Sequence, residues 1–148
     1  VTIMSTPYYI IDNSFLNKIT DDYLLTMTDE HLQELIDGFR ISSSVKFKQC
    51  SKLSDRDDNL KQYNQTLTDE EVEILANLMV LEWLRPQINS IELLKQSMST
   101  RDYKIYSQSR HLDSLKALKQ DTMAEVDKLI VSYTYSNNSL GNLGKVQS

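Results

Sequence analysis

The stretch Thr68 to Ser97, TDEEVEILANLMVLEWLRPQINSIELLKQS, predicts the central helix of the fold. It opens with a capping box, in which the side chains of Thr68 and Glu71 satisfy each other's exposed backbone N–H groups. Apolar residues then cover more than one helical face, which is typical of a helix buried on several sides. Trp83 lies within this stripe, and we interpret it as a core residue.

Pro86 interrupts this helix. Proline has no backbone N–H to continue the hydrogen-bond ladder, and its ring clashes with the preceding turn. We therefore expect the helix to stop or kink near Arg85, and a shorter helix to restart at Asn89-Ser90.

Two further helices are predicted on either side. Thr28 is the candidate N-cap of the first, with Asp29 and Glu30 placed where the helix dipole favours acidic side chains. The second runs from about Ser107 to Tyr133, where apolar residues recur at helical spacing. Between the first helix and Thr66 the periodicity fades, which predicts an extended loop with a solvated charged segment at 55–59.

The composition favours an all-α fold. The chain has 148 residues with only 3 Gly and 2 Pro, too few for the many tight turns of a β-sandwich. We expect a small helical bundle with a long C-terminal helix, one domain over 1–135 and a flexible C-terminal tail over 136–148. No transmembrane segment or signal peptide is evident, so we expect a protein made inside the cell.

The residue types give little support to catalysis. His31 and His111 lie far apart in sequence and are expected to be exposed, and Cys50 has no activating motif near it. The three glycines cannot build a phosphate-binding loop, and the His and Cys positions form no zinc pattern. We therefore predict no catalytic, cofactor-binding or metal-binding residues.

DNA binding is the alternative that the sequence leaves open. A helix-turn-helix of residues 89–98 and 107–133 would present Gln108, Arg110 and His111 near the start of its second helix. The formal net charge of −5 opposes it, because an acidic protein repels phosphates.

The stretch from Leu67 to Tyr135 resembles the small head-tail connector, or neck adaptor, proteins of tailed bacteriophages. The resemblance lies in the capped helix, the EWLRPQINS break at 82–90, the YSQ at 106–108 and the YTY that ends at Tyr135. It implies an all-α structural protein of the virion neck, assembled in the bacterial host cytoplasm.

The same resemblance implies the partners. These proteins form a ring, commonly of twelve copies, that binds the portal protein and a further neck or tail protein. Genomic DNA passes through the ring without sequence-specific binding, and no membrane is involved.

Position and residue type suggest which residues make these contacts. Tyrosines at the edges of the fold, including the Tyr8-Tyr9 pair, are suited to contacts with a partner because their rings are amphipathic. Candidate portal contacts are Tyr133, Tyr135, Asn137, Asn138, Leu140 and Leu143. Candidate inter-subunit or loop contacts are Arg101, Tyr103, Lys104, Tyr106 and Arg110.

Overall fold

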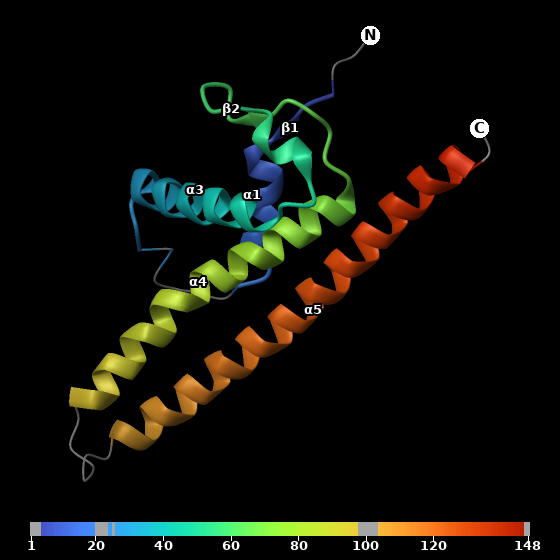
Figure 1. The fold of residues 1–148 in the computed structure, drawn as a ribbon. Coiled ribbons are helices and arrows are strands. Elements are labelled where there is room, and N and C mark those ends of the chain that lie inside the picture. Colours follow the sequence, from blue (N-terminus) through green and yellow to red (C-terminus); the bar gives the residue numbers. More distant parts are fainter. Residues whose placement is uncertain (1–3, 20–23, 25, 98–103, 147–148) are drawn as a thin grey trace.

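The protein folds into a helical bundle around one central helix. The computed structural model describes residues 4–19, 24, 26–97 and 104–146, and in the last helix it describes side chains from Ser107 to Asn137. The described elements are β1 (Thr6–Pro7), α1 (Tyr8–Leu16), α3 (Asp29–Lys46), a 3-10 helix (Ser51–Ser54), β2 (Arg56–Asp57), β3 (Gln62–Tyr63), α4 (Asp69–Ser97) and α5 (Lys104–Val146) (Figure 1). The predicted all-α class with a long C-terminal helix is confirmed.

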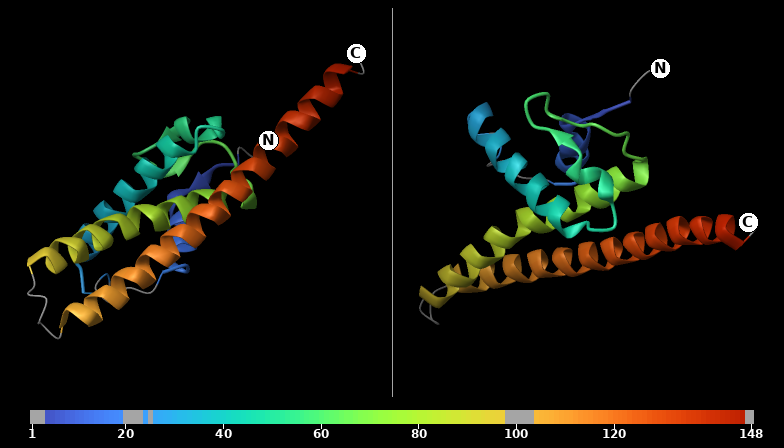
Figure 2. Two further views of the ribbon diagram at one scale, coloured as in Figure 1. Left: turned by 60° about the horizontal axis from the view of Figure 1, so that its bottom comes forward. Right: turned by 45° about the horizontal axis from the view of Figure 1, so that its top comes forward.

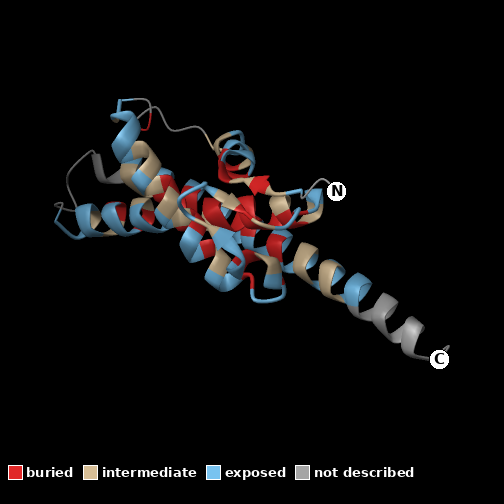
Figure 3. Cartoon of the chain, turned by 90° about the horizontal axis from the view of Figure 1, so that it is seen from above, coloured by how far each residue is buried: buried red, intermediate tan, exposed pale blue. Residues whose placement is uncertain are grey.

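The central helix is α4. It packs against α1 and α3 on one side and against α5 on the other, as two further views also show (Figure 2). Buried residues gather where these helices meet, and exposed ones lie toward the helix ends (Figure 3). Trp83 is buried, as predicted.

The capping box at the start of α4 forms as the sequence predicts. The Thr68 N–H donates to Glu71 Oε1 at 2.8 Å, and the Glu71 N–H donates to Thr68 Oγ1 at 3.2 Å. These two bonds satisfy backbone donors that have no partner inside the helix.

The sequence predicted that this helix stops or kinks near Arg85. The predicted stop is wrong, because α4 continues through Pro86 to Ser97. Pro86 itself is exposed, whereas Leu84 and Ile88 on either side of it are buried and hold both halves against the neighbouring helices. The side chain of Gln87 donates to the Trp83 carbonyl at 3.1 Å, one turn earlier. Packing and this bond offset the loss of one ladder bond.

The first helices cover one side of α4. Thr28 caps α3 as predicted, accepting a hydrogen bond from the His31 N–H at 3.3 Å. α3 continues to Lys46, beyond the point where the sequence periodicity fades. α1 passes through Asn13-Ser14 without a break.

The expected loop contributes β2 and β3 to a small antiparallel sheet, in which the strand order is β1-β3-β2. Thr6 pairs with Tyr63, and Arg56 pairs with Tyr63 from the other side. The turn between β2 and β3 ends at Lys61, whose φ of 53° lies in the left-handed region. The sheet anchors the chain start onto the hairpin and closes one end of the core.

α5 lies antiparallel to α4 and projects past the start of α4 at its C-terminal end (Figures 1 and 2). Its backbone is helical to Val146, so the prediction that the helix ends near Tyr133 is wrong. The residues expected to form a tail are therefore helical over 136–146. At ~1.5 Å per residue, the helix is about 65 Å long.

Candidate functional site

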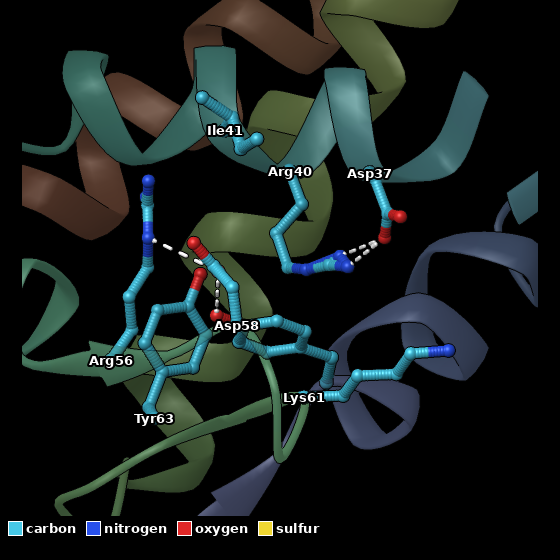
Figure 4. A pocket seen from close by; sticks show the side chains of 8 residues that line it. Asp37, Arg40, Ile41, Arg56, Asp58, Lys61 and Tyr63 are labelled. Carbon is cyan, nitrogen blue, oxygen red and sulfur yellow. Dashed lines mark hydrogen bonds and ion pairs between the residues drawn. The ribbon is translucent and has the colours of Figure 1, made fainter. Parts of the chain in front are cut away.

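A pocket lies between α3 and the β2–β3 hairpin (Figure 4). Its volume is about 150 Å³. The chain start, α3 and the hairpin all contribute to it. The residues that line it are Tyr8, Asp37, Arg40, Ile41, Arg56, Asp58, Lys61 and Tyr63.

Arg40 forms the base of this pocket and is almost fully buried, with 2% of its surface exposed. Its guanidinium donates to Asp37 Oδ1 from Nη1 at 2.7 Å and also from Nη2. Its Nε lies 3.6 Å from Asp12 Oδ1, and its Cζ lies 4.0 Å from the centre of the Tyr8 ring. A buried charge with two carboxylates and an aromatic face is stabilised where it lies, so Arg40 joins α3 to α1.

Tyr8 and Asp58 join the hairpin to the same cluster. Tyr8 Oη donates to Asp58 Oδ1 at 2.6 Å, and the Tyr8 ring packs edge-on against Tyr63 with centroids 5.1 Å apart. Arg56 Nε lies 3.4 Å from the same oxygen, Asp58 Oδ1. Tyr8 was predicted to serve a partner contact; this is wrong, because the residue is buried, whereas Tyr9 is 63% exposed.

The pocket offers a positive environment without a nucleophile poised to react. Its lining carries three cations and two carboxylates. Tyr8 beside Asp58 is the pair in it that most resembles a nucleophile with a base. Burial, followed by the hydrogen bond to Asp58, raises the pKa of Tyr8, so the phenol stays protonated. We interpret this pocket as a structural junction.

A second polar cluster centres on the carboxylate of Glu71, 1% exposed at the start of α4. Lys52 Nζ donates to Glu71 Oε1 at 2.9 Å. Cys50 Sγ and Tyr133 Oη both donate to Glu71 Oε2, at 3.0 Å and 2.8 Å. Together with the Thr68 N–H, these bonds tie the 3-10 segment and α5 to the start of α4.

The same contacts set the ionisation of the cluster. Burial opposes the charge on Glu71, but the hydrogen bonds from the Thr68 backbone, Cys50, Lys52 and Tyr133 outweigh it and lower the pKa of Glu71 to about 2. Burial and the adjacent carboxylate raise the pKa of Cys50 to about 11. Cys50 is therefore a protonated thiol, and this cluster acts as a fixed connection between helices.

The predicted portal contacts divide into two groups. Tyr133 is half-buried: its hydroxyl binds Glu71, and its ring packs edge-on against Phe47 with centroids 5.3 Å apart. Tyr135 is 75% exposed and Asn137 is also exposed. The side chains of Asn138, Leu140 and Leu143 lie outside the described residues, although their backbone belongs to α5.

Three of the five predicted inter-subunit or loop contacts lie near the start of α5. Arg110 is exposed on the helix. Lys104 and Tyr106 belong to the first turn of α5, but their side chains are not described. Arg101 and Tyr103 lie outside the described residues.

The structure does not support the helix-turn-helix candidate. Residues 89–97 are the last turns of α4, and the following helix lies antiparallel beside it (Figure 1). A DNA-binding pair would instead cross at about 90–120°. Since burial holds α4 together through Pro86, no separate first helix forms.

Sequence reasoning missed Arg40 and the partners of Glu71. A signal for Arg40 was present, because it follows the apolar Ile36 by one turn and lies one turn after Asp37 on α3. For Glu71 the sequence predicted the cap but not the long-range bonds to Cys50, Lys52 and Tyr133. Those partners come from segments whose relative positions only the packed helices define.

Comparisons of this chain with protein-family models, curated proteins and solved structures found no match. Within the described residues, no group of three or more His, Cys, Asp or Glu side chains is arranged to hold a metal ion. None of the described helices is both long and apolar enough to cross a membrane.

Proposed function

We propose that this chain is a structural subunit of the neck of a tailed bacteriophage, forming a ring that joins the portal to the tail and extends the DNA channel. The sequence resemblance spans Leu67 to Tyr135, and in the fold this stretch is α4 together with most of α5. The resemblance therefore covers the central helical pair.

The observation that carries the proposal is the exposed side of α5. One face of this helix packs on the body through Leu112, Leu115 and Val126, which are buried. The other face carries large apolar side chains in water: Val131 is 69% exposed and Tyr135 is 75% exposed, one turn apart. Such side chains are suited to a contact with another protein.

The layered arrangement also fits a ring. A closed ring needs two different faces on each subunit, which meet head to tail around the axis. In this fold α4 separates an α1–α3 face from an α5 face (Figure 2). The acidic net charge suits a channel through which DNA slides, because negative walls do not retain phosphates.

Deleting residues 136–148 is expected to weaken binding to the portal ring without unfolding the protein, because Val131 and Tyr135 remain on the shortened chain. The deletion removes the projecting end of α5 but retains the hydrogen bond between Tyr133 and Glu71. Native mass measurement of the chain with and without the portal protein checks the result. Asp121→Asn in the full chain is the matched control, since it changes an exposed α5 side chain away from the projecting end and should leave portal binding intact. Unchanged portal binding by the shortened chain would show that this end is not the contact.

A small DNA-binding regulator is the alternative, and a gel shift separates the two. The proposed neck subunit is expected to show little affinity for free duplex DNA at about 0.15 M salt. A regulator would shift a duplex under these conditions, and a clear shift would count against the neck assignment.

A further inference from the structure

Two cations contact one buried carboxylate where α3 and α4 meet, and a third cation, on α5, acts on the first of them. Glu82 of α4 is buried, and its Oε1 accepts from Lys46 Nζ of α3 and lies 3.5 Å from Arg85 Nη2. Lys119 of α5 is close enough to act electrostatically on Lys46. The cluster therefore has three positive charges and one negative charge, in a chain whose net charge is −5.

These cations are exposed and repel one another. Lys46, Arg85 and Lys119 all reach the surface, with 41% and 60% of the first two side chains exposed. Burial, followed by the charges of Arg85 and Lys119, lowers the pKa of Lys46. One carboxylate does not balance three cations, so a further anionic group beside them would be stabilised.

A complementary acidic cluster lies at the other end of α3. Asp29, Glu30 and Glu34 are all exposed, and none of them forms an ion pair with another described residue. The start of α3 lies away from α4, and its end lies beside α4 (Figure 1; Figure 2, right).

The two clusters cannot neutralise each other within one copy. α3 has 18 residues, so at ~1.5 Å per residue its ends lie about 27 Å apart. That separation is about three times the screening length of roughly 8 Å at physiological salt. The helix dipole accounts for acidic residues at the start of α3 and for Lys46 at its end. It does not account for Arg85 and Lys119, which come from two other helices.

We propose that the acidic start of α3 in one copy of this chain docks on the Lys46–Arg85–Lys119 cluster of the next copy. The two clusters lie at different places on the subunit, as a head-to-tail contact requires. Charge complementarity of this kind fixes register and speeds association. The inference rests on the proposed ring and names the surfaces that would close it.

Reciprocal charge reversal tests this contact. The first variant carries Glu30→Lys with Glu34→Lys, which makes the start of α3 basic. The second carries Arg85→Gln with Lys119→Glu, and it keeps Lys46 to pair with the buried Glu82. Each variant alone would place like charges opposite one another in every head-to-tail contact.

Self-association of the chain is measured by sedimentation at high protein concentration and by the number of copies bound to a portal ring. Each variant alone is expected to associate about tenfold or more weakly than the wild type, because opposed like charges cost more than 1.4 kcal/mol. An equimolar mixture of the two variants should recover association, since acidic and basic clusters then alternate around the ring. Circular dichroism of each variant checks that it is folded.

The outcomes separate this inference from the proposed function. Folded variants that assemble like the wild type would overturn the contact, as would a mixture that fails to recover, while wild-type binding to the portal would leave the neck assignment standing. Failure of the wild type to bind the portal would count against the neck assignment itself. If the second variant loses affinity for a short DNA duplex but self-associates normally, the cation cluster is a phosphate site and the proposed contact is wrong.

Discussion

Replacing Glu71 with Gln is expected to lower the free energy of unfolding by about 3 kcal/mol at pH 7. The hydrogen bonds from Thr68, Cys50, Lys52 and Tyr133 hold the pKa of Glu71 at about 2, against an ordinary value of 4.5. Glutamine has the same shape but no charge, and its amide cannot accept all of these bonds. Urea unfolding followed by circular dichroism measures the difference.

The same carboxylate predicts a pH dependence with a defined sign. Because the folded-state pKa lies below the unfolded-state value, the stabilisation is present above about pH 5 and is lost as the pH falls toward 2. The wild type and the Glu71→Gln variant should therefore converge in stability as the solution is acidified. A difference that stays constant from pH 7 to pH 3 would contradict the assignment.

Glu70→Gln is the matched control for this experiment. Glu70 lies in the same first turn of α4 and experiences the same helix dipole, but it forms no ion pair with another described residue. Its replacement should cost no more than about 0.5 kcal/mol. A large cost at Glu70 would indicate that the helix dipole, and not the buried bonds, stabilises the cap.

Replacing Arg40 with Met is expected to destabilise the fold by about 3–5 kcal/mol, the cost of breaking a buried ion pair from one side. Asp12 is buried, and its Oδ1 has no hydrogen-bond partner among the described residues, so Arg40 Nε at 3.6 Å is the compensating charge for this atom. Burial already raises the pKa of Asp12, and loss of the guanidinium would raise it further. Thermal and urea unfolding both report the change.

A second substitution identifies the cause. If the uncompensated charge of Asp12 produces the loss, adding Asp12→Asn to Arg40→Met should recover part of the stability. Arg56→Met is the control, because its ion pair with Asp58 is exposed and is expected to contribute less than about 1 kcal/mol. Equal losses at Arg40 and Arg56 would show that burial of the guanidinium is unimportant.

Local sequence patterns determined where α3 and α4 begin. Thr28 and Thr68 cap α3 and α4 as predicted because an N-cap depends only on side chains within one turn. The burial of Trp83 followed from apolar spacing along a single helix. The resemblance to neck adaptors also rests on local sequence, over Leu67 to Tyr135, and it does not identify which residues contact a partner.

Only the tertiary structure decided where helices continue and which polar groups meet. α4 passes through Pro86 because buried residues on both sides hold it against its neighbours. The free energy of this packing is not included in the helix propensity of the local sequence. Glu71 joins Cys50, Lys52 and Tyr133 across 19 to 62 residues of sequence, and the Arg40 and Glu82 clusters each draw on separate helices. Contacts between distant segments depend on how the helices pack, so the local spacing of residues along the sequence cannot predict them.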